Sequence, residues 1–299
     1  MATILKHPQV EDYFVELTLD EIKERPHGII PEYESNRLII LKDYRLPIDL
    51  DVFAEMSTNL GRIEDPKIRR TVKKMTSTSF LREGYSADDV RTVPNPITRA
   101  AYDVLCNGDA DLYLGVRDAM RTAHETLLHL YEICFPDYSY FRIIPTIRLT
   151  QTLFENLHWD NHQIAEDFQQ ARIFCNLDQR PRIWHVSHNF VTYARQLYQE
   201  HQLSRFAGQD PNLLNNYICG SVLGGSRNAC RDNLPRHVIA FEPGEIWFGE
   251  SRMLAHQIFY GERAMVYMFM IDPTRMLSPE RRFNAQVEAL HCEAANLAA

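Results

Sequence analysis

The residues from about 140 to 272 form a series of short apolar and aromatic runs separated by turn residues. They read YFRIIPTIRLTQTLF, ARIFCNLD, PRIWHVS and, further on, HVIAFEPGEIWFGESRMLAHQIFYGERAMVYMFMID. β-Branched and aromatic residues at this spacing favour strands, and Pro243 with Gly244 fits a type II turn between two of them. Many short strands joined by tight turns indicate a closed or two-sheet β architecture, which restricts the fold more than any other feature of the chain.

The residues before about 140 predict an α/β region that supports these strands. Leu38 to Tyr44 is a short apolar run suited to a strand, and residues 115–138 repeat apolar positions at helical spacing up to a proline. No Gly/Ser/Pro-rich linker divides the chain, so we expect one domain. Its parts are a support region over 1–139, a core over 140–272 and a polar, helical tail over 273–299. The predicted fold class is mainly β with flanking helices, built on a cupin-like jelly-roll core with an N-terminal helical region.

Composition excludes several classes of protein. The 299 residues carry a formal net charge of −8, which disfavours a dedicated nucleic-acid binder. The six cysteines are scattered and form no CxxC pair, so neither a zinc ribbon nor a thioredoxin-type site is indicated. The sequence shows no signal peptide and no apolar stretch long enough to span a membrane. We therefore expect a cytoplasmic protein whose partners are neither membranes nor nucleic acid, and its oligomeric state is left open.

The segment FENLHWDNHQI places His158 and Asp160 two residues apart. In an extended segment, residues i and i+2 point to the same side, so both side chains can reach one point in space. About a hundred residues later, a Pro-Gly hairpin leads a strand towards His256, the candidate third ligand. Two imidazoles and one carboxylate on one face of an octahedral ion form the 2-His-1-carboxylate triad typical of non-haem Fe(II) oxygenases. The spacing alone is not specific, since the tail also contains His291-Cys292-Glu293.

Together these segments resemble the Fe(II)/2-oxoglutarate-dependent dioxygenase superfamily over roughly residues 140–272. Its members share a double-stranded β-helix, a His-x-Asp/Glu pair, a distal histidine and a downstream basic residue that holds the tail of 2-oxoglutarate. The resemblance implies that His158, Asp160 and His256 bind Fe(II), and that 2-oxoglutarate and O2 are co-substrates.

The resemblance also implies an arginine that anchors 2-oxoglutarate. Arg263 follows the candidate ligand His256 by seven residues, and its planar fork matches a carboxylate. That gap is shorter than in many members of the superfamily, so Arg148 and Arg172 on flanking strands remain alternatives.

The activity that the resemblance implies is hydroxylation of an unactivated C–H bond in a small-molecule metabolite, with release of succinate and CO2. Length and layout favour small-molecule hydroxylases, of which the Kdo hydroxylases of lipopolysaccharide modification are one candidate. A carboxylate at Asp160 favours hydroxylation over halogenation. The alternatives are a desaturase or cyclase on the same iron centre, a demethylase of nucleic acid or protein, and a cupin-like binding protein without turnover.

Other polar residues near these strands have two interpretations each. Trp159 should point away from the metal and pack, whereas His162 either lines a pocket or faces solvent. His185 and His188 are expected in structural or surface roles, with substrate binding or replacement of a ligand as the alternative. Arg182 lies at the surface or meets an acidic substrate, and the sequence does not decide between these.

Overall fold

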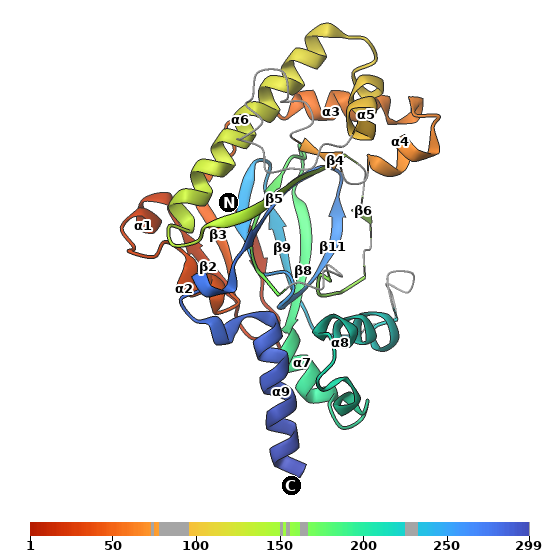
Figure 1. Cartoon of the computed structure of the whole chain (residues 1–299). Coiled ribbons are helices and arrows are strands. Elements are labelled where there is room, and N and C mark those ends of the chain that lie inside the picture. The colour runs from red at the N-terminus through yellow and green to blue at the C-terminus, as the bar shows by residue number, and fades with distance from the viewer. Residues whose placement is uncertain are drawn as a thin grey trace.

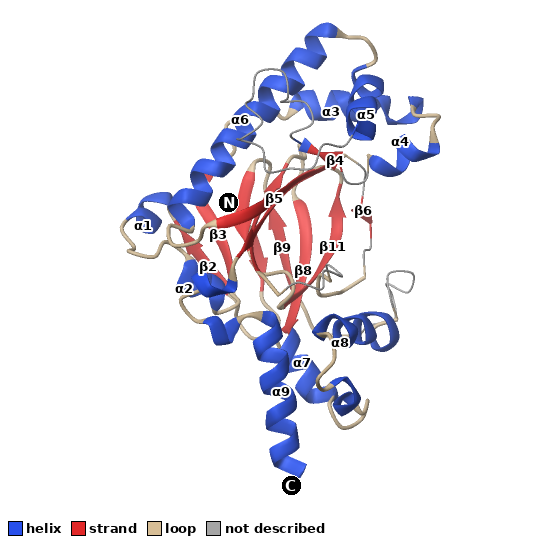
Figure 2. Cartoon of the chain, in the orientation of Figure 1, coloured by secondary structure: helices blue, strands red, loops and turns tan. Residues whose placement is uncertain are grey.

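The computed structural model describes residues 1–72, 75–77, 96–149, 152–153, 156–161, 167–224 and 233–298. Two β-sheets occupy the middle of the molecule (Figure 2). The helices α3 to α6 gather at one end, and α7, α8 and α9 lie at the other (Figure 1).

The strands are β1 (Thr3–Leu5), β2 (Phe14–Leu17), β3 (Leu38–Arg45), β4 (Met75–Thr76), β5 (Tyr140–Arg148), β6 (Thr152–Leu153), β7 (Gln169–Asn176), β8 (Arg182–Asn189), β9 (His237–Phe241), β10 (Glu245–Phe248), β11 (Leu254–Gly261) and β12 (Ala264–Ile271). The α-helices are α1 (Leu19–Lys23), α2 (Ile30–Glu34), α3 (Asp51–Thr58), α4 (Pro66–Thr71), α5 (Pro96–Cys106), α6 (Ala110–Cys134), α7 (Phe190–Leu197), α8 (Pro211–Tyr217) and α9 (Phe283–Ala298). Short 3-10 helices cover Asn59–Arg62, Leu203–Phe206, Pro273–Arg275 and Pro279–Arg281, and a π-helical turn covers Ile218–Val222.

The strand order identifies the fold. One sheet runs β1-β9-β8-β11-β6 and the other β2-β3-β10-β7-β12-β5-β4. From β5 onward the chain passes back and forth between the two sheets, and all these strands pair antiparallel. This is the jelly-roll arrangement, a double-stranded β-helix, so the predicted fold class is confirmed.

Two clusters of apolar side chains account for the apolar runs in the strand sequences. The outer face of the seven-stranded sheet packs against α3, α5 and α6, through residues such as Ile173 and Tyr267. The inner faces of both sheets meet in a second cluster that contains Phe174, Trp184 and Trp247. Because β12 is covered on both faces, it is apolar almost throughout instead of alternating with polar residues.

The region before residue 140 contributes more to the sheets than the sequence predicted. The expected strand is present as β3, and β1, β2 and β4 also join the sheets. The expected long helix is α6, whose N-cap Asp109 accepts two backbone N–H bonds and whose last residue precedes Pro136. Among the described residues, no helix combines the length and apolarity needed to cross a membrane.

Candidate metal centre

His158 and His256 are held side by side by backbone hydrogen bonds. The His158 N–H donates to the His256 carbonyl (3.1 Å), and the His256 N–H donates to the His158 carbonyl (2.9 Å). This isolated antiparallel bridge fixes the short segment after β6 against the edge of β11. The two imidazole rings lie with their centroids 4.6 Å apart. Residues almost a hundred positions apart in the sequence therefore present their side chains to one place.

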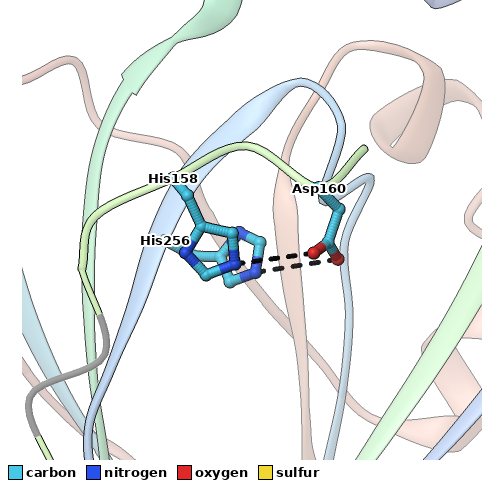
Figure 3. A group of neighbouring side chains, drawn as sticks. All are labelled: His158, Asp160 and His256. Carbon is cyan, nitrogen blue, oxygen red and sulfur yellow. Dashed lines mark ion pairs between the residues drawn. The ribbon is translucent and has the colours of Figure 1, made fainter. Parts of the chain in front are cut away.

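Asp160 completes the group (Figure 3). Its Oδ1 is 3.5 Å from His158 Nε2, and its Oδ2 is 3.8 Å from His256 Nε2. One donor atom from each of the three side chains lies within 4.8 Å of the other two. Metal–ligand bonds to imidazole and carboxylate are about 2.0–2.2 Å long. Donors this close fit one shared ion, and the structure brings together all three residues that the sequence nominated.

Backbone carbonyls orient both histidines so that Nε2 faces the shared point. His158 Nδ1 is 2.7 Å from the Asn156 carbonyl, and His256 Nδ1 is 3.1 Å from the Leu254 carbonyl. A carbonyl only accepts, so each Nδ1 carries a proton, and Nε2 is the ring nitrogen that faces Asp160 and is left to bind a metal. Backbone carbonyls in this position commonly orient the imidazoles of metal sites.

The carboxylate of Asp160 is fixed by its neighbours. Arg172 Nη1 donates to Asp160 Oδ2 and to the Ser251 hydroxyl (2.5 Å), while the Asp160 N–H donates to the Ser251 carbonyl (2.8 Å). Burial raises the pKa of Asp160, but the Arg172 guanidinium and the two imidazoles outweigh it and hold that pKa well below its usual range. Asp160 is therefore an anion at neutral pH, as a metal ligand must be.

Helix α8 supports the segment from its other side. Asn215 donates to the Asp160 carbonyl (3.3 Å), and Asn161 donates to the Asn212 carbonyl (3.1 Å) and the Asn216 side chain (2.7 Å). Trp159 turns the opposite way from its neighbours, is buried, and stacks on Tyr193. These contacts hold His158 and Asp160 on one face of an extended segment.

A cavity of about 130 Å³ opens from the three residues into the space between the sheets. This is far more than the ~10–15 Å³ that one water molecule needs. The described residues that line it are Ile144, Thr146, Arg148, His158, Asp160, Arg172, Phe174, Arg182, Trp184, Trp247, His256, Ile258, Ala264, Val266 and Met268. One end holds the three candidate ligands, the middle is aromatic and aliphatic, and the other end is basic.

The position of the basic end follows from strand register. Arg172 is paired with Met268 of β12, whereas Arg148 is paired with Ala264, four residues away. At about 3.3 Å per residue this is roughly 13 Å along the strand. Arg182 also lies four residues from Val186, the register partner of His256. Arg148 and Arg182 thus share the end of the cavity that is remote from Asp160.

The structure decides between the two positions that the sequence left open for Arg182. Its side chain is 2% exposed, so the surface interpretation is wrong. The guanidinium lies against Gly261, where an added Cβ would stand 2.6 Å from its Cζ. Its Nη1 is 3.8 Å from Asp178 Oδ2. The available signal was alternation, because Arg182 shares one face of β8 with buried Trp184.

The structure does not bring Arg263, the first choice of anchor, to the cavity. Its N–H and Nε approach Asp178 Oδ1 at 2.6 and 3.4 Å, and its Nη2 lies 3.3 Å from Glu262. Arg263 is absent from the described cavity lining, whereas both alternatives, Arg148 and Arg172, are in it. The physical reason is direction, since Arg263 precedes the inward-facing Ala264 by one residue and so points to the other side.

His185 and His188 stand apart from this centre. His185 stacks on Phe259 and bonds to Gln257, and His188 stacks on Tyr193. Neither lines the described part of the cavity. His162 lies outside the described residues.

Comparison with known proteins supports the fold. No family model and no curated protein matches the sequence. Solved structures of the Kdo hydroxylase KdoO, a non-heme Fe(II) α-ketoglutarate-dependent dioxygenase, do match at 14% identity, over 95% of this chain and 96% of theirs. The TM-score is 0.61 for the complex with α-ketoglutarate and Fe(III), 0.63 for that with succinate and Fe(III), and 0.62 for that with cobalt(II). The chain therefore has the fold of this dioxygenase.

Proposed function

We propose that the protein is an Fe(II)/2-oxoglutarate-dependent oxygenase that hydroxylates an unactivated C–H bond of a small-molecule metabolite, releasing succinate and CO2. The observation that carries the proposal is one cavity with two imidazoles and a carboxylate at one end and two arginines at the other. This donor set suits Fe(II) oxygenases, since it leaves three positions of an octahedral ion open. The shared fold with KdoO supports the same assignment.

In this proposal His158, Asp160 and His256 hold Fe(II). When iron and 2-oxoglutarate are bound, they supply the oxidising chemistry that uses O2. The chain's own part is to fix the three donors, exclude bulk water and direct one substrate C–H bond at the centre. The backbone bridge between the histidines and the Ser251 contacts of Asp160 serve the first of these tasks.

Arg148 and Arg182 would hold the C5 carboxylate of 2-oxoglutarate. A dicarboxylate held at the ion by one end would place its other carboxylate in the cavity, where these two side chains lie. The third arginine of the lining, Arg172, already binds Asp160 at the metal end. Arginine suits this role because its fork matches a carboxylate and its charge persists at every physiological pH.

The carboxylate of Asp160 also influences which atom is transferred to the substrate. It occupies the position that a halide would need, so we expect transfer of oxygen rather than chlorine to the substrate. Kdo and related acidic sugars are the first substrates to assay, since the fold neighbours are Kdo hydroxylases. A product two hydrogens lighter than the substrate would instead indicate desaturation or ring closure.

The test is Fe(II)-dependent conversion of 2-oxoglutarate to succinate. His158→Ala, Asp160→Ala and His256→Ala should each abolish turnover, while His185→Ala, a histidine outside the centre, should retain it. Wild-type turnover by a folded His256→Ala variant would refute the proposed centre. If the metal-loaded wild type forms no succinate with Kdo or a panel of acidic sugars, the alternative of a cupin-like binding protein without turnover would be favoured.

The anchor is tested separately through the KM for 2-oxoglutarate. Arg148→Met and Arg182→Met should each raise it, by roughly 30-fold or more if about 2 kcal/mol or more is lost with a buried charge pair. Arg263→Met is the matched control and should leave it unchanged. A raised KM for Arg263→Met, with no change for Arg148→Met and Arg182→Met, would identify Arg263 as the anchor.

A further inference from the structure

We infer that Arg172 restricts Asp160 to binding the metal through one carboxylate oxygen; this inference rests on the proposed metal centre. Carboxylates bind cations through either one or both oxygens. Here Oδ2 accepts a hydrogen bond from Arg172 Nη1, whereas Oδ1 faces His158 Nε2 at 3.5 Å. The guanidinium N–H occupies one of the two lone pairs of Oδ2 and its positive charge draws electron density from that oxygen, so Oδ1 is the stronger ligand atom, although Oδ2 also lies 3.8 Å from His256 Nε2.

The guanidinium of Arg172 is itself held in place. Besides Asp160 it donates to the Ser251 hydroxyl (2.5 Å), which also lies 3.4 Å from the Gln170 amide. The same amide donates to Glu250, and both Gln170 and Glu250 are buried. Ser251 closes the ring because its carbonyl accepts the Asp160 N–H. Arg172 can therefore resist rotation of the carboxylate, which a freely moving surface arginine could not do.

This restriction has a consequence for the ion. An octahedral ion with three single-atom protein donors has three positions left. A carboxylate that bound through both oxygens would take one of them. 2-Oxoglutarate uses two positions, so the remaining one for O2 would be lost. Arg172 is thus a positioning residue that keeps a coordination site open.

The number of water molecules on a bound ion tests this role without turnover. Mn(II) bound to the protein in water enriched in oxygen-17 gives an electron paramagnetic resonance line whose broadening counts coordinated water. We expect Arg172→Met to have one fewer water than the wild type, because Asp160 then chelates with both oxygens. Arg172→Lys, which keeps a charged N–H donor, should restore the wild-type count.

The alternative roles predict different counts. If Arg172 only supports Asp160 as a ligand, its loss frees the carboxylate from the ion and the number of coordinated water molecules rises by one. If that number does not change, Arg172 has no influence on how Asp160 binds the ion. Either result overturns the inference. Arg148→Met removes a cation from the same cavity without touching Asp160, and should leave the count unchanged. If Arg172→Met does not fold, Arg172→Leu, which also lacks an N–H donor, carries the same expectation.

The wild type separates this inference from the proposed function. Failure of the wild type to bind Mn(II), or binding that survives His256→Ala, would refute the metal centre and the inference with it. A wild type with the expected waters but no 2-oxoglutarate turnover would refute the activity, while the role of Arg172 would still be decided by the variants.

Discussion

Gly261 ends β11 directly beside the guanidinium of Arg182, and replacing it with alanine tests the basic end of the cavity. The new Cβ would lie 2.6 Å from Arg182 Cζ and 3.0 Å from its Cγ. Both distances are too short, and Arg182 is buried, so its side chain cannot simply swing into solvent. Overpacking of this kind costs about 1–3 kcal/mol. The displaced guanidinium should also bind 2-oxoglutarate at least about tenfold more weakly, a loss of about 1.4 kcal/mol.

Two measurements follow these effects. Urea unfolding gives the free energy of unfolding of the metal-free protein, and calorimetric titration of the Mn(II)-loaded protein gives the Kd for 2-oxoglutarate. Gly249→Ala is the matched control, because Gly249 is also buried and its added Cβ would meet nothing closer than 3.9 Å. It should change neither quantity by as much.

A double-mutant cycle identifies the cause. If the clash is with the guanidinium, Gly261→Ala should cost little stability once Arg182 is methionine, so the two changes are strongly non-additive. Additive losses would place the strain elsewhere. A Gly261→Ala protein with the stability and the 2-oxoglutarate affinity of the wild type would refute the packing argument and weaken the case for Arg182 as an anchor.

Two further changes probe the centre and the tail. Asp160→Asn should lower the free energy of unfolding of the metal-free protein at pH 7. The pKa of Asp160 in the folded state lies below its unfolded value near 3.9, so the ionised carboxylate stabilises the fold above that pH. The difference between the two proteins should therefore persist down to about pH 5 and shrink as the pH falls below about 4. A pH-independent difference in urea unfolding would contradict this. Glu34→Ala should cost about 2–4 kcal/mol, because the buried carboxylate accepts the N–H groups of Leu277 and Ser278 and its loss leaves them unpaired. Glu34→Gln, which keeps one acceptor, should cost less; equal losses would argue against the hydrogen bonds.

The fold could be predicted because its strands are short and their turns are explicit. Gly244, with φ of +73°, sits where the Pro-Gly pair predicted a type II turn, and β9 and β10 lie on either side. What could not be predicted was the share of the N-terminal region in the sheets. β1 and β4 have only three and two residues, so no period of alternation can be recognised in them. Their positions depend on the edges of sheets that form from distant parts of the chain.

The three candidate ligands could be predicted from the sequence because local backbone geometry determines where their side chains point. His158 and Asp160 need only an extended segment to point the same way, and His256 needs only to lie on a strand that reaches them. The arginines depend on which face of a strand turns inward. β12 is apolar on both faces, so its sequence does not tell whether Arg263 or Ala264 begins the inward row.

Strand β8 shows how that ambiguity is resolved when the two faces differ. Arg182, Trp184 and Val186 form its buried row, whereas Ile183 and His185 on the other face are partly exposed. A charged residue in the same row as tryptophan and valine must be buried with them, and a buried guanidinium needs an anion or dense hydrogen bonding to offset its desolvation. Asp178 at 3.8 Å supplies part of this charge. A carboxylate in the cavity would supply more, so binding of a dicarboxylate should stabilise the wild type towards unfolding more than it stabilises Arg182→Met. Equal shifts in Tm for the two proteins would mean that the buried charge of Arg182 serves the fold alone.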